Sequence, residues 1–109
     1  MPTREEVLQT LRRLETTLAD PALENRVLQQ DEETRRKFVA ARQNVTILKG
    51  KLENAQLAEI AERLDRLGPE LSAGIDQLEA ALSRVESAVA VVNTISSVLG
   101  IVARIAAFP

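Results

Sequence analysis

The C-terminal third of this chain limits its fold more than any other part, because no charged residue occurs from Ser87 to Ala103. At helical spacing, one line through this run stays polar or small. Its members are Asn93, Ser96, Ser97 and Gly100. A single polar line leaves the rest of the helix surface apolar, so this helix needs cover on nearly every side.

The remaining faces of the same run carry branched aliphatic side chains. They are Val91, Ile95, Val98, Ile101, Val102 and Ile105. Three other helices are too few to cover all of them, so we expect an exposed apolar strip on the tail from Ser87 to Phe108. Such strips usually mark a surface that binds a partner or a membrane.

Composition favours one helical domain over residues 1–109. The chain has 109 residues, 45% of them hydrophobic, with four Gly and four Pro. Phe38 and Phe108 are its only aromatic residues. A core built from Leu, Val, Ile and Ala suits helices that meet along seams better than packed sheets. The sequence therefore predicts an all-α fold.

The N-terminal residues 1–30 are expected to form a helical cover. Thr3-Arg4-Glu5-Glu6 has the pattern of a capping box and starts a helix over about 3–19. Asp20-Pro21 supplies an N-cap and a first-turn proline for a short helix over about 21–29.

Residues 31–109 are expected to form a long antiparallel hairpin. Its first arm spans about 32–67, with a phase shift in the apolar seam that local unwinding near Gly50 or Gln56 absorbs. Gly68-Pro69 is the predicted turn, because Gly suits a helix end and Pro suits a helix start. The second arm then spans about 69–107. The alternative at Gly68-Pro69 is a kinked helix that continues through the proline.

A basic stripe accompanies the first arm. Between Thr34 and Leu52 the chain has basic residues and no acidic one, and Arg35, Arg42 and Lys49 recur every seven positions. One interpretation is that this stripe binds acidic groups of a partner or anionic lipid headgroups. The other is a solvated flank, paired in part with Glu5, Glu6 or Glu15.

The composition argues against catalysis and cofactors. No Cys and no His are present, which removes thiol nucleophiles, the usual zinc ligands and the commonest general base. Glu59, Glu62, Asp76 and Glu79 are better explained as surface carboxylates than as metal ligands. We expect no catalytic residue, metal, cofactor or small-molecule substrate. A net charge of −2, with Phe38 as the single aromatic among the basic residues, argues against nucleic acid.

Two functions fit these features. The first is a non-catalytic helical protein that assembles with itself or with a protein partner through its C-terminal helix. The second is a membrane-associated or membrane-active protein, such as a pore-forming component, whose C-terminal helix contacts lipid. The N-terminus has no apolar segment of the kind a secretory signal needs, so the expected location is the cytoplasm, with membrane association under the second function.

Overall fold

The computed structural model describes residues 3–83 and 87–106, and every regular element within these ranges is a helix. The all-α class is confirmed. The elements are α1 (Arg4–Leu18), α2 (Pro21–Leu28), α3 (Glu32–Asn54), α4 (Leu57–Ser83) and α5 (Ala88–Ile105).

The N-terminal helices begin where their capping residues predict. The Thr3 hydroxyl accepts a hydrogen bond from the Glu6 amide at 3.2 Å, which satisfies a free N–H group at the start of α1. The Asp20 carboxylate accepts from the Ala22 amide at 3.0 Å, and Pro21 occupies the first turn of α2. Both predicted cover helices are therefore confirmed to within two residues at each end.

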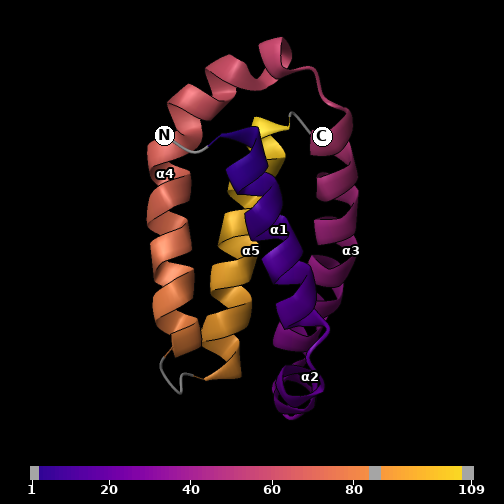
Figure 1. Ribbon diagram of the computed structural model, residues 1–109. Helices are drawn as coiled ribbons and strands as arrows, with labels where there is room; N and C mark the ends of the chain where they lie inside the picture. The colour runs from indigo at the N-terminus through magenta and orange to yellow at the C-terminus, as the bar shows by residue number, and fades with distance from the viewer. Residues whose placement is uncertain (1–2, 84–86, 107–109) are drawn as a thin grey trace.

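Four of the helices form an elongated bundle, and the chain as a whole measures 43 × 23 × 20 Å. α1 packs along α3, α3 along α5, and α5 along α4, while the short α2 lies against α3 and α5 at one end. Figure 1 looks onto α1, with α3 and α4 on its two sides and α5 behind it.

The first predicted hairpin arm, 32–67, is divided in two. α3 ends at Asn54, and Ala55 takes an extended conformation with φ −73° and ψ 140°. The predicted unwinding near Gln56 is thus a complete break, because the apolar seam changes phase there and both parts bury their own stripe. α4 starts at the end of the bundle opposite α2. It crosses that end and then runs back along the length of the bundle (Figure 1). Leu57, the first residue of α4, is 56% exposed.

The predicted turn at Gly68-Pro69 is wrong, because both residues lie inside α4. The chain has already reversed at Ala55, so no second reversal is needed here. A proline inside a helix removes one backbone hydrogen bond and bends the helix. Figure 1 shows such a bend in the upper part of α4. The kinked-helix alternative therefore describes this position.

The second hairpin arm, 69–107, is also divided. α4 ends at Ser83, and α5 begins after Ser87, whose hydroxyl accepts from the Ala90 amide at 3.2 Å. Two long antiparallel helices do pack side by side, but they are α4 and α5. The tail positions 107 and Phe108 lie outside the described residues.

Candidate functional site

The six aliphatic residues expected on an exposed strip are buried within the chain. Their exposed fractions are 7% for Val91 and Ile101 and 0% for the other four. They join one core cluster with the leucines of α1. The expectation of an exposed strip is therefore wrong for these positions. The error was to treat residues 69–107 as one helix, so that the C-terminal part of α4 was not counted as a cover for α5.

The polar or small line predicted on this helix forms the outer surface of α5. Asn93, Ser97 and Gly100 are exposed, and Ser96 is half-buried at the edge of the line. A Cβ atom built at Gly100 meets nothing within 4 Å, so the backbone of α5 is open to solvent at that point.

A shallow groove of about 210 Å³ follows the boundary between α3 and α5. Ala40 and Asn44 line it from α3, and Gly100 and Ala103 line it from α5. Lys37 crosses one end of the groove, where its Nζ donates to Asn93 Oδ1 at 3.1 Å.

On the other side of α5, the outer edge of α4 is also uncharged over two turns. Glu70 marks this edge, because its Oε1 accepts from Arg104 Nη2 of α5 at 2.6 Å. Helical spacing places Ala73, Gln77 and Ala80 on the same side of α4 as Glu70, and all three are exposed.

Together these residues form one broad surface, which we call the α5 face. It comprises Ala40 and Asn44 of α3, Ala73, Gln77 and Ala80 of α4, and Asn93, Ser97 and Gly100 of α5. All eight are exposed and uncharged. The charged groups that border it, Lys37 and the Glu70–Arg104 pair, lie toward its two ends.

The basic stripe lies elsewhere and is paired within the chain. Lys49 Nζ contacts Glu15 Oε1 at 2.7 Å, as the solvated-flank interpretation allowed. Arg42 donates to the Leu18 carbonyl at 2.8 Å and pairs with Glu24. Its guanidinium also stacks over the Phe38 ring, 4.6 Å from the centroid.

The third residue of the stripe, Arg35, donates to the Gln30 carbonyl at 3.0 Å. Since all three basic groups have partners on their own chain, none of them joins the α5 face. The geometry thus favours a structural role for the stripe.

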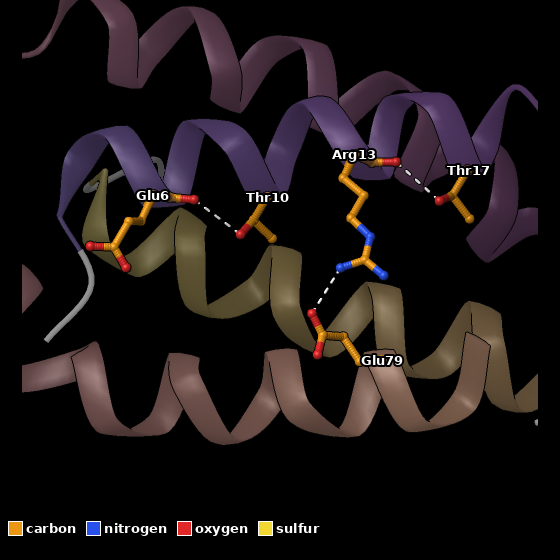
Figure 2. A network of polar contacts seen from close by, with 5 residues as sticks. All are labelled: Glu6, Thr10, Arg13, Thr17 and Glu79. Carbon is orange, nitrogen blue, oxygen red and sulfur yellow. Dashed lines mark hydrogen bonds and ion pairs between the residues drawn. The ribbon is translucent and has the colours of Figure 1, made fainter. Parts of the chain in front are cut away.

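The opposite side of the bundle, around α1, is polar and charged. Figure 2 shows Arg13 of α1 reaching across to Glu79 of α4, with 2.8 Å between Nη1 and Oε1. Thr10 and Thr17 donate their hydroxyl hydrogens to the carbonyls of Glu6 and Arg13. Both hydroxyls therefore have their hydrogen-bond acceptors on their own helix.

The carboxylates of α4 do not converge on a common centre. Glu62 pairs with Arg66, and Glu79 pairs with Arg13. Over residues 3–83 and 87–106, no three acidic side chains come together in a group that could hold a metal ion.

One pKa is shifted in a way that the local structure explains. Asp31, the N-cap of α3, accepts a hydrogen bond from the Thr34 hydroxyl. That hydrogen bond stabilises the carboxylate and lowers the pKa of Asp31 below its usual value. This contact fixes the start of α3 and lies at a helix end.

The geometry defines a five-helix bundle with one uncharged outer face. Comparisons of this chain with protein-family models, with curated proteins and with solved structures found no match.

Proposed function

We propose that this protein is a non-catalytic helical protein that assembles as a dimer of two identical chains through the α5 face. The observation that carries the proposal is the absence of charged side chains across eight neighbouring exposed positions. Covering uncharged, small residues costs little desolvation, whereas covering charged ones costs several kcal/mol unless they are paired. A second copy offers a surface of the same uncharged kind.

The residue sizes along α5 also fit a two-fold contact. Suppose that a two-fold axis passes through Ser97 perpendicular to α5, so that the two α5 helices are antiparallel. Asn93 of one copy then lies opposite Gly100 of the other, because both residues are about one helical turn from the axis. The open backbone at Gly100 leaves room for the Asn93 side chain. Small residues let helix backbones approach closely, which improves packing between the two copies.

The available area indicates a weak dimer. α5 has 18 residues, so it is about 27 Å long, and three packed helices span about 20 Å. A contact over this whole area, which extends past the α5 face to Lys37 and Arg104, would bury at most roughly 540 Å² per copy, or about 1,100 Å² for the pair, just below the usual range for specific interfaces. We therefore expect association that depends on protein concentration in a cell compartment such as the cytoplasm.

Sedimentation equilibrium over about 1 μM to 1 mM tests this proposal, since weak dimers dissociate within that range. The wild type should gain mass as concentration rises. Ser97→Arg places a charge in the middle of the α5 face and should keep the protein monomeric. Gln9→Arg places the same charge on α1 and should behave like the wild type. A monomeric wild type at every concentration would refute the proposal.

A second function is favoured by one specific observation. Among the described residues, Ala88–Ile105 is the one helix whose length and apolar composition suffice to cross a membrane, and half of it is buried in the bundle. This supports a membrane-active protein whose α5 enters lipid. Co-sedimentation of a monomeric wild type with anionic vesicles, together with dye release from them, would favour this function over dimerisation.

A further inference from the structure

The contact between α1 and α4 differs from the other helix contacts of the bundle. α1 packs along α3 and α4 packs along α5, but close approaches between α1 and α4 are sparse. A groove of about 370 Å³ separates them. Its lining combines polar side chains, Gln9 and Thr10 on α1 and Ser72 and Asp76 on α4, with apolar surface that includes Ile75. The α1–α4 contact is therefore hollow at its outer edge, whereas apolar residues of both helices, such as Leu11 and Leu71, are 0% exposed.

A single ion pair spans this seam in the described residues. Arg13 Nη1 and Glu79 Oε1 are 2.8 Å apart, and Figure 2 shows the arginine side chain extended across the gap. Both side chains are about half exposed, at 53% and 52%. Exposed ion pairs stabilise a fold only slightly, so this one adds little to the closed seam.

The break between α3 and α4 divides the chain into two halves that meet at this seam. Ala55 and Gln56 separate a first half, α1 to α3, from a second half, α4 and α5. Arg4 of α1 donates to the Ala55 carbonyl at 2.8 Å, which holds the start of α1 at this joint. The halves meet along α3 and α5, which pack closely, and along α1 and α4, which do not.

We infer that the bundle opens along the α1–α4 seam, with the Arg13–Glu79 pair as a weak latch that biases it toward the closed form. Opening uncovers the side of α5 that lies opposite Ser97, which includes Ile95 and Val102 by helical spacing. Both residues are 0% exposed in the closed bundle. This inference goes beyond the proposed dimer, because it concerns the buried side of α5 and leaves the α5 face unchanged.

Thiol labelling measures this opening directly, because the natural chain has no Cys. Val102→Cys reports the side of α5 behind the seam. Val45→Cys reports the contact between α3 and α1, where Val45 lies beside Leu18 and is 1% exposed. Both reporters are made in the full chain and labelled without denaturant. The inference expects faster labelling at position 102 than at position 45.

The latch is then reversed and restored. Arg13→Glu puts two carboxylates at the seam and should raise the labelling rate at position 102 about three-fold or more, the scale of an exposed ion pair. The rate at position 45 should not change. Adding Glu79→Arg to the same chain should return the rate at position 102 to that of the natural pair.

The Arg36–Glu32 pair supplies a matched control, because it is exposed and lies within α3 at 2.9 Å. Arg36→Glu should leave labelling at position 102 unchanged. Equal labelling at positions 102 and 45, or an equal effect of Arg36→Glu and Arg13→Glu, would show global unfolding and overturn the inference. Hydrogen exchange of α5 peptides, with and without Arg13→Glu, makes the same test without cysteine and with the same two outcomes.

Discussion

α1 and α5 lie on opposite sides of the bundle and bury similar apolar stripes, but their outer surfaces differ. α1 exposes Glu5, Arg12 and Arg13, and ion pairs of Arg13 and Glu15 tie it to α4 and α3. α5 exposes one charged residue, Arg104, near its end, and otherwise small or neutral side chains. Burial therefore explains why both helices belong to the fold. The difference in charge between the two outer surfaces is what supports the proposal that α5, and not α1, is a contact surface.

The largest effect should come from placing charge on the inner side of α5. Val98 and Val102 are both 0% exposed, and each buried, unpaired carboxylate costs several kcal/mol against a total stability of about 5–15 kcal/mol. The double variant Val98→Asp/Val102→Asp should be unfolded by circular dichroism. Ser97→Asp, one residue away on the outer side, should keep the helical signal. A folded double variant would contradict the burial described for α5.

Glycine replacements separate folding from association. Gly50 of α3 and Gly100 of α5 are both inside helices, and a Cβ at either position meets nothing within 4 Å. Each change to Ala should raise the free energy of unfolding by about 0.5–1 kcal/mol at low concentration, because Ala favours helix. Gly100→Ala should also weaken the dimer, while Gly50→Ala should not. Thermal melts and sedimentation measure the two effects separately, and equal masses for both variants would count against the α5 face.

A smaller effect is expected within the basic stripe. Arg42 makes a carbonyl hydrogen bond, an ion pair and an aromatic contact, so Arg42→Ala should lower the free energy of unfolding by about 1–2 kcal/mol. Arg35→Ala removes only one exposed hydrogen bond and should cost about 0.5 kcal/mol or less. Urea denaturation compares them. Equal costs would mean that Arg42 does not act as a tie between α3 and its neighbours.

The smallest effect concerns the cap of α3. The folded-state pKa of Asp31 is lowered by the Thr34 hydroxyl, so this carboxylate stabilises the fold above its ordinary pKa. That contribution is lost as the pH falls through the lowered value. Thr34→Val should raise the pKa of Asp31 toward its usual range in an NMR titration. An unchanged pKa would assign the shift to another group.

Local chemistry predicted the helix starts well. Thr3 and Asp20 cap α1 and α2 as their sequence patterns indicate, because caps depend on residues three positions apart or fewer. The same local reasoning failed at Gly68-Pro69, where it predicted a turn and the structure has a continuous helix. A proline is compatible with a helix start and with a kink, and only the packing of α4 along α5 decides between them.

The site was predicted in part. The line of Asn93, Ser97 and Gly100 follows from helical spacing, and the structure places it on the surface. The α4 contribution from Ala73 and Gln77 was missed, because it depends on where the chain divides between α4 and α5. The sequence left Glu5, Glu6 and Glu15 open as partners of the basic stripe. The packing of α1 along α3 brings Glu15 to Lys49.

The most direct test of the α5 face is disulfide formation between two identical chains. Ser97→Cys and Gln9→Cys each create the single thiol of an otherwise cysteine-free chain, one on the α5 face and one on α1. Under mild oxidation, the two-fold contact predicts rapid, nearly complete disulfide dimer with Ser97→Cys and only slow dimer with Gln9→Cys. Equal rates for the two variants would contradict the claim that α5 is the surface through which this protein assembles.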